Sequence, residues 1–123
     1  MTPFGKKVRE LRAERGVNLK DMAEALGVSA PYLSALEHGH RGSPAWYLVQ
    51  RIIAYFNVIW DEAEQLERLA QISHPRVTID TSGLPAEATE LAHYLQRNIR
   101  SLEIADLRAL QSTLERFIEA RAR

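Results

Sequence analysis

The sequence contains no cysteine among its 123 residues. Disulfide bonds and thiolate chemistry are therefore excluded. Long apolar runs are also missing, because no stretch approaches the roughly 20 residues that a membrane-spanning helix needs. No signal-peptide pattern opens the chain. Together these absences favour a cytoplasmic protein that does not interact with a membrane.

An excess of charge of either sign is absent too, since 16 Lys and Arg balance 16 Asp and Glu. A basic overall balance, which would favour a nucleic-acid partner, is thus lacking. The charges are nevertheless unevenly distributed along the chain. Residues 1–57 carry eight Lys or Arg against five Asp or Glu, residues 58–72 carry one against four, and the remainder is balanced. The positive charge is therefore concentrated in the N-terminal part.

The combinations of residues that carry catalysis are not found either. The acidic residues follow the solvent faces of predicted helices, and there is no Ser/His/Asp set and no glycine-rich phosphate loop. His38 and His40 form an H-x-H pair, but neither cysteine nor a nearby set of acidic ligands accompanies them. We therefore expect no enzymatic activity, no bound metal and no cofactor.

The stretch that stands out is NLKDMAEALGVSAPYLSALE, residues 18–37, which predicts two short helices joined by a tight turn. Its apolar residues fall on one face of each helix: Met22, Ala23 and Leu26 in the first, and Leu33 and Leu36 in the second. Gly27 can take the left-handed conformation of a helix exit, and Ser29 can cap the second helix, with Pro31 in its first turn. The pattern indicates a helix-turn-helix, whose second helix can enter a major groove of DNA.

Residues 5–70 resemble the XRE family of phage-repressor-like helix-turn-helix domains. The resemblance is carried by this stretch, by LRAERG before it, by LEHGHRGSP after it and by the hydrophobic helix that follows Pro44. It implies a DNA-binding transcriptional regulator. By the same resemblance, Arg12 pairs with Glu37 at the end of the recognition helix and links the first helix to the third. The chain departs from the family at Leu19, where Gln is typical and contacts a phosphate.

The resemblance also implies which residues meet the DNA. The groove-facing positions would be Ala30, Pro31, Tyr32, Ser34 and Ala35. Because this set lacks Arg, Gln and Asn, base recognition would depend on Ser34, Tyr32 and apolar contact with thymine methyl groups. The alternative for Tyr32 is that its ring only packs against its neighbours. The other expected DNA contacts are Asn18, Lys20, Ser29, His38, His40, Arg41 and Ser43.

An all-α fold is predicted for the whole chain, with one interruption. Residues 1–72 are expected to form a five-helix repressor-like domain. Thr2 is expected to cap its first helix, which ends at Gly16, Asn18 the helix after that, and Ser43 the fourth. Residues 73–85, SHPRVTIDTSGLP, break the helical pattern, and Val77 to Thr81 alternate like a strand. This segment is either a linker or a short strand that pairs with its copy in another subunit. Residues 86–123 are expected to form a two-helix dimerisation hairpin.

The hairpin carries more apolar surface than two helices can cover by packing against each other, so a second copy is the expected partner. The residues expected at this interface are Val77, Ile79, Leu91, Leu95, Ile104, Leu107, Leu110, Leu114 and Phe117. A homodimer would bind double-stranded DNA at an inverted-repeat operator. We expect a sequence-specific regulator of this kind, acting as a repressor. An antitoxin with the same DNA-binding head and a toxin-binding C-terminal region is the alternative.

Overall fold

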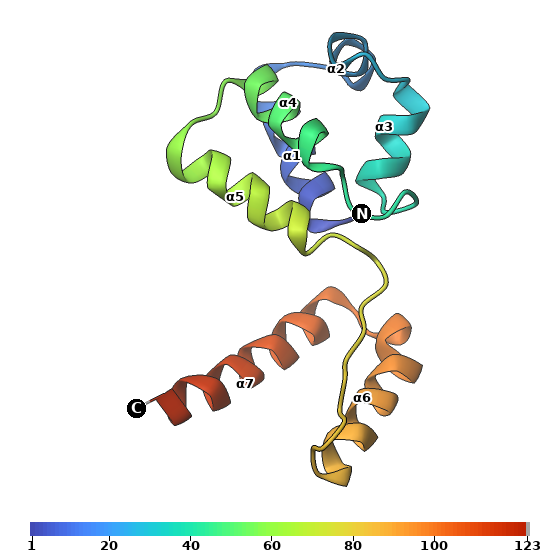
Figure 1. Ribbon diagram of the computed structural model, residues 1–123, viewed down its shortest axis with the longest axis vertical. Helices are drawn as coiled ribbons and strands as arrows, with labels where there is room; N and C mark the ends of the chain where they lie inside the picture. The colour runs from blue at the N-terminus through green and yellow to red at the C-terminus, as the bar shows by residue number, and fades with distance from the viewer. Residues whose placement is uncertain (123) are drawn as a thin grey trace. The chain divides into compact units, whose positions relative to one another are not determined.

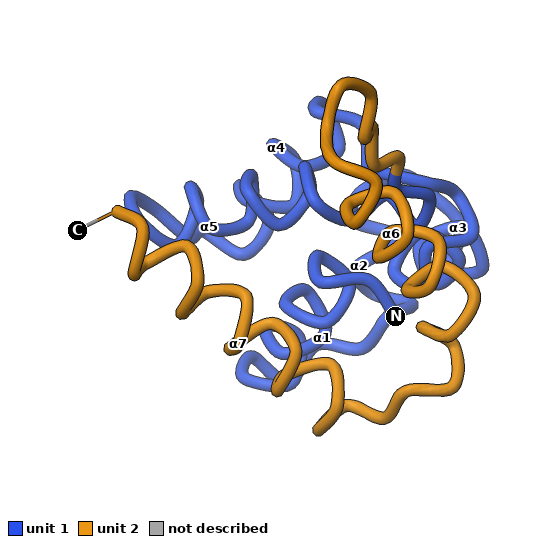
Figure 2. The backbone as a smooth tube through the Cα atoms, turned by 90° about the horizontal axis from the view of Figure 1, so that it is seen from below, with its two compact units in different colours: residues 1–77 blue, residues 78–123 orange. Residues whose placement is uncertain are grey.

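The computed structural model describes residues 1–122, and within them it contains seven α-helices, one short 3₁₀ helix and no strand (Figure 1). The predicted all-α fold is thus confirmed. The chain divides into two compact units, residues 1–77 and residues 78 onward (Figure 2). The division falls inside the segment that breaks the helical pattern of the sequence.

Unit 1 contains five helices, whose ends follow from local chemistry. They are α1 (Pro3–Arg15), α2 (Leu19–Leu26), α3 (Ala30–Glu37), α4 (Trp46–Phe56) and α5 (Trp60–Gln71). The predicted caps are confirmed, because the side chains of Thr2, Asn18 and Ser29 accept hydrogen bonds from backbone N–H groups in the first turns of α1, α2 and α3. Left-handed Gly16 and Gly27 end α1 and α2.

The core of unit 1 is a single cluster to which all five helices contribute. Its largest fully buried apolar side chains are Phe4, Val8, Leu11, Met22, Leu26, Leu33, Val49, Ile52 and Leu66. α1 and α3 approach each other most closely at Gly5, where a Cβ atom would lie 2.2 Å from the carbonyl oxygen of Glu37. That carbonyl accepts hydrogen bonds from the backbone N–H and the hydroxyl of Thr2. The start of α1 is therefore fixed against the end of α3.

Ser73, just beyond α5, also belongs to this unit. Its side chain is buried, accepts a hydrogen bond from the backbone N–H of Phe4 and donates one to the carbonyl of Leu69. The first bond satisfies an N–H of α1 that has no partner within its own helix. The segment after α5 consequently closes unit 1.

One expectation for α4 was wrong. Ser43 does not cap this helix, because the chain remains extended through Ala45 and the helix begins at Trp46 without a side-chain cap. Leu48, Val49, Ile52 and Phe56 form the buried face of the helix, whereas Trp46 and Tyr47 are largely exposed. The exposed aromatic residues therefore lie at the solvent side of its first turn.

Unit 2 contains α6 (Ala86–Asn98), a 3₁₀ turn (Ile99–Ser101) and α7 (Ile104–Ala122). Residues 77–81 before them form no strand in the described chain. In the turn that follows, the backbone N–H of Ser82 donates to the carboxylate of Asp80, and the side chain and backbone of Ser82 lower the pKa of Asp80 from its ordinary value. A hydrogen bond of 2.8 Å between the Thr81 and Thr89 hydroxyls ties this segment to α6.

The two long helices of unit 2 follow each other as the predicted C-terminal helical hairpin, but in the single chain their apolar faces are not buried against each other. α6 and α7 diverge from the 3₁₀ turn like the arms of a V (Figure 1), and neither has a buried residue in its described part. A 3.6-residue apolar period correctly predicts each helix, but it does not determine which surface covers it. The exposed large apolar residues of this unit are Ile79, Leu84, Leu91, Tyr94, Ile99, Ile104, Leu107, Leu110, Leu114, Phe117 and Ile118, and Val77 at the end of unit 1 is exposed as well.

Candidate nucleic-acid interface

α2 and α3 form the predicted helix-turn-helix. The left-handed Gly27 (φ 74°) turns the chain, half-buried Val28 packs against the core, and Ser29 begins α3 with its hydroxyl accepting from the N–H of Tyr32 at 3.1 Å. Leu33 and Leu36 are buried, so the opposite side of α3 faces solvent. Half-buried Leu19 packs against the core in place of the polar residue typical of the family.

A buried ion pair between Arg12 and Glu37 holds α3 against α1. The guanidinium contacts both carboxylate oxygens, with Nη2 to Oε1 at 3.1 Å and a second bond from Nη1 to Oε2. Arg12 is 8 % and Glu37 is 2 % exposed. The bidentate geometry satisfies both buried charges, which would otherwise be costly to remove from water. The pairing that the resemblance implied is therefore present, and it fixes the end of the recognition helix.

The residues expected to meet DNA lie on accessible parts of unit 1. Those exposed are Asn18, Lys20, Ser29, Pro31, His38, His40, Arg41 and Ser43, and those half-buried are Ala30, Tyr32, Ser34 and Ala35. The half-buried residues are all in α3, where side chains point partly toward the core and partly toward solvent. Tyr32 packs against the core cluster with part of its ring, as the alternative interpretation required, while the rest of it remains accessible.

The loop after α3 is folded back along the helix. His38 closes α3 with its ring Nδ1 2.9 Å from the carbonyl oxygen of Ser34, and the His38 and His40 rings lie 6.2 Å apart. Arg41 places its guanidinium 5.6 Å from the centre of the Tyr32 ring. This contact joins a residue expected to read bases to one expected to contact phosphates. Sequence patterns did not predict this contact, because it depends on the path of the loop.

A second pair near the helix-turn-helix was also missed. Arg51 of α4 donates a hydrogen bond of 3.1 Å to the Tyr47 hydroxyl and lies over its ring. Its Nη1 atom would be 3.9 Å from a Cβ atom on Gly27. A positive charge therefore lies beside the turn between α2 and α3. The i, i+4 spacing of Tyr47 and Arg51 was the available signal.

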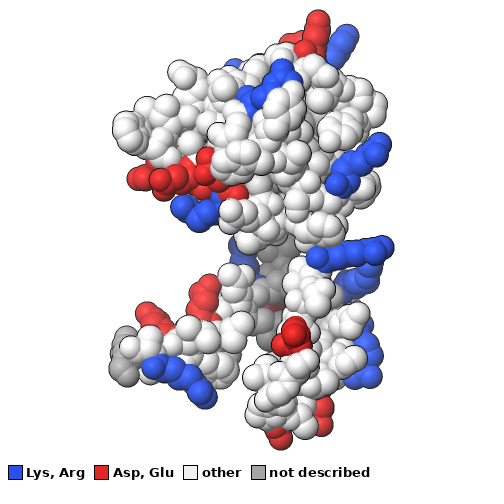
Figure 3. Space-filling view, in the orientation of Figure 1, with Lys and Arg blue, Asp and Glu red and all other residues white. Residues whose placement is uncertain are grey.

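Charge on unit 1 is unevenly distributed. On the face shown in Figure 3, acidic side chains gather over α5, which carries Asp61, Glu62, Glu64 and Glu67. The helix-turn-helix and the following loop contribute the cations Lys20 and Arg41, together with the exposed carboxylates Asp21 and Glu24. Within residues 1–122, no group of three or more His, Asp or Glu is placed to hold a metal ion, and no helix is long and apolar enough to cross a membrane.

The comparison with known families agrees with this geometry. A family profile described as a helix-turn-helix domain matches residues 3–73, which include all five helices of unit 1 and Ser73. The chain belongs to the XRE family of helix-turn-helix regulators. Relatives in this family are named as HTH-type transcriptional regulators.

Individual relatives are similar over part of the chain. The HTH-type transcriptional regulator DdrOP3 of Deinococcus deserti is 44 % identical over 52 residues, which are 42 % of this chain and 40 % of the relative. The uncharacterized HTH-type transcriptional regulator RghRB of Bacillus subtilis is 33 % identical over 61 residues, 50 % of this chain and 44 % of the relative. SinR of Bacillus subtilis is 28 % identical over 73 residues, 56 % of this chain and 66 % of the relative. The chain thus spans between two fifths and two thirds of these relatives.

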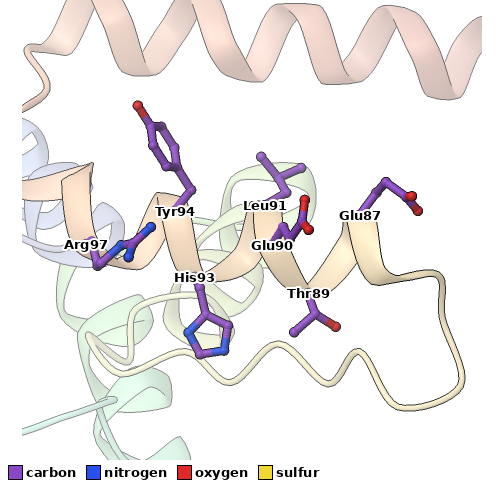
Figure 4. A pocket seen from close by; sticks show the side chains of 7 residues that line it. All are labelled: Glu87, Thr89, Glu90, Leu91, His93, Tyr94 and Arg97. Atoms are coloured by element: carbon purple, nitrogen blue, oxygen red, sulfur yellow. The ribbon is translucent and has the colours of Figure 1, made fainter.

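Unit 2 presents apolar surface rather than a deep pocket. A shallow depression lies on α6, and the residues around it are Glu87, Thr89, Glu90, Leu91, His93, Tyr94 and Arg97. Leu91 and Tyr94 point to one side of the helix, and Thr89 and His93 to the other (Figure 4). A second depression lies on α7 around Leu114 and Ile118. Since each is lined by a single helix, neither encloses a small ligand.

Proposed function

We propose that this protein is a sequence-specific transcriptional repressor that binds an inverted-repeat operator as a homodimer. The observation that carries the proposal is the accessible side of α3, which offers Ser34 and Tyr32 beside the basic loop at Arg41. A helix held in this way can enter a major groove while the loop contacts phosphates. Repression requires only that the bound dimer occupies its operator, whereas activation requires a further surface for the transcription machinery.

Base recognition through α3 would use few hydrogen bonds. Ser34 and Tyr32 supply the only hydroxyls at its groove-facing positions, and the bidentate side chains that best discriminate guanine or adenine are absent there. Apolar contact of Ala30, Pro31 and Ala35 with thymine methyl groups would supply part of the preference. Phosphate contacts from Asn18, Lys20, Ser29, His38, His40, Arg41 and Ser43 would supply much of the affinity. Binding should therefore weaken steeply as salt rises.

Dimerisation would come from unit 2. The apolar stripe of α7 comprises Ile104, Leu107, Leu110, Leu114 and Phe117, each of them exposed in the single chain. Burying a large apolar side chain contributes roughly 2 kcal/mol, so covering this stripe with a second copy would stabilise a dimer by several kcal/mol. Leu91 and Leu95 of α6, together with Val77 and Ile79, would extend the interface. Two recognition helices would then meet half-sites about 34 Å apart, or a multiple of that distance.

The experiment that tests this function is electrophoretic mobility shift on duplexes selected by the full-length protein. The proposal requires a preference for an inverted repeat, a shifted species that contains two protein chains, and an altered sequence preference when Ser34 is replaced by Ala. Equal affinity for all duplexes of the same length would contradict it.

The exposed apolar faces of α6 and α7 favour one further candidate. They would equally suit a different protein, which is the arrangement of an antitoxin whose C-terminal region covers a toxin. Sedimentation of the purified full-length chain separates the two proposals. A dimer at micromolar concentration supports self-association, and a monomer that becomes larger only with the product of a neighbouring toxin-sized reading frame supports the antitoxin.

A further inference from the structure

Arg41 is held in place by the loop that carries it. Gly39 and Gly42 on either side both adopt left-handed conformations, with φ of 83° and 74°. The backbone N–H groups of Gly39 and His40 donate to the carbonyls of Leu36 and Ala35, which keeps the loop against the last turn of α3. The backbone position of Arg41 is therefore tied to the recognition helix.

The loop is also enclosed by two other segments of unit 1. A Cβ atom on Gly39 would lie 3.0 Å from the Thr2 side chain and 3.7 Å from Pro75, and one on Gly42 would lie 3.4 Å from His74. Thr2, before α1, thus lies beside the loop at Gly39. The segment after Ser73 lies beside the loop at both Gly39 and Gly42. Such close packing leaves the loop little freedom to move away from α3.

The Tyr32 ring lies between two surfaces. Part of it packs against the core, and the Arg41 guanidinium lies 5.6 Å from its centre. The backbone N–H of Tyr32 is bonded to the Ser29 hydroxyl, which fixes the first turn of the helix beneath the ring. A planar guanidinium can stack on an aromatic face, while an ammonium of the same charge is compact, strongly hydrated and not planar.

We propose that Arg41 is a positioning residue for Tyr32, and thereby helps to determine which bases the protein prefers rather than only how tightly it holds the phosphates. This inference rests on the proposed function of α3 as the recognition helix. Through its contact with the ring, Arg41 restricts the directions in which the Tyr32 hydroxyl can reach a base edge. Arg41 and Tyr32 would consequently act on sequence preference as one unit.

The test uses two full-length variants. One keeps the positive charge at position 41, and the other removes the aromatic ring at position 32. Arg41→Lys retains the positive charge and loses the planar guanidinium. Tyr32→Leu retains apolar bulk against the core and loses the aromatic ring. Arg9→Lys, on the exposed side of α1, is the matched control for exchanging the cation. For each variant, alone and combined, affinities are measured for the selected duplex and all its single-base changes, at two salt concentrations. Thermal melting verifies that each variant is folded.

We expect Arg41→Lys to leave the salt dependence unchanged and to alter discrimination by about two- to fivefold, corresponding to an exposed cation–aromatic contact. The alteration should fall at the base pairs that respond to Tyr32→Leu, and it should disappear in the Tyr32→Leu background. The proposal would be overturned if Arg41→Lys discriminated between bases as the wild type does. It would also be overturned if Arg41→Lys altered discrimination equally in the wild-type and Tyr32→Leu backgrounds. Either result would leave the recognition function of α3 intact. A wild-type protein without any preference would instead overturn the proposed function itself, and this inference with it.

Discussion

The Ser73 hydroxyl accepts a hydrogen bond of 2.9 Å from the backbone N–H of Phe4, 69 residues earlier in the chain. It also donates to the Leu69 carbonyl in the last turn of α5. One buried hydroxyl therefore joins the first turn of α1 to the last turn of α5. It satisfies a backbone N–H at the start of one helix and a backbone carbonyl at the end of the other.

Replacing Ser73 by Ala should lower the free energy of unfolding of unit 1 by about 1–3 kcal/mol, because the Phe4 N–H would be left buried without a partner. Denaturant unfolding followed by circular dichroism measures this difference. Ser43→Ala, in an exposed loop position of the same unit, is the control and should change little. Equal stability of the two variants would show that the Ser73 bond does not contribute.

The Arg12–Glu37 pair predicts a non-additive mutant cycle. Arg12→Met and Glu37→Leu should each destabilise the fold by about 3 kcal/mol, since each strands a buried charge. The double variant should recover a large part of that loss, because it leaves neither charge unpaired. Thermal or denaturant unfolding of the wild type, the two single variants and the double variant measures the coupling free energy between the two residues. Strict additivity would rule out the pairing as a source of stability.

Gly5→Ala should destabilise the protein even though alanine favours helices more than glycine does. The added methyl group would meet the backbone of Glu37 at 2.2–2.8 Å, and backbone atoms cannot move aside as a flexible side chain can. We expect a loss of about 1–3 kcal/mol or more from overpacking. A Gly5→Ala protein as stable as wild type would show that α1 and α3 can separate freely.

The stripe on α7 predicts which changes abolish self-association. Leu110→Glu with Leu114→Glu should convert the dimer to a monomer without unfolding unit 1, because it places two charges in the proposed interface. Ala105→Glu with Ser112→Glu adds the same charge on the opposite side of α7, where both residues are exposed, and should leave the dimer intact. Sedimentation equilibrium distinguishes these outcomes. If both double variants remained dimeric, the interface would lie elsewhere than on this stripe.

Sequence reasoning predicted the features of this fold that depend on neighbouring residues. The caps at Thr2, Asn18 and Ser29 and the helix exits at Gly16 and Gly27 each involve residues within a few positions, so their chemistry is visible in the sequence. Resemblance to the family supplied the longer-range Arg12–Glu37 pair.

The features that were missed depend on how distant segments meet. The close approach at Gly5, the Ser73 bond to Phe4 and the contact of the Arg41 guanidinium with the Tyr32 ring all require the tertiary arrangement. The expected cap at Ser43 was wrong because buried Pro44 and extended Ala45 delay the start of α4 to Trp46. In unit 2, the period of the apolar residues predicted α6 and α7. It did not predict that the two helices diverge, because periodicity does not specify which surface buries the apolar face of a helix.

Selection from a random pool of DNA duplexes by the full-length protein tests the central claim most directly. If α3 recognises bases and unit 2 supplies the dimer, the bound fraction should converge on an inverted repeat with half-sites about one helical turn apart or a multiple of it. Ser34→Ala should change the selected half-site in both arms. A pool that remains random after repeated selection at moderate salt, or that converges on a single half-site without symmetry, would contradict the account.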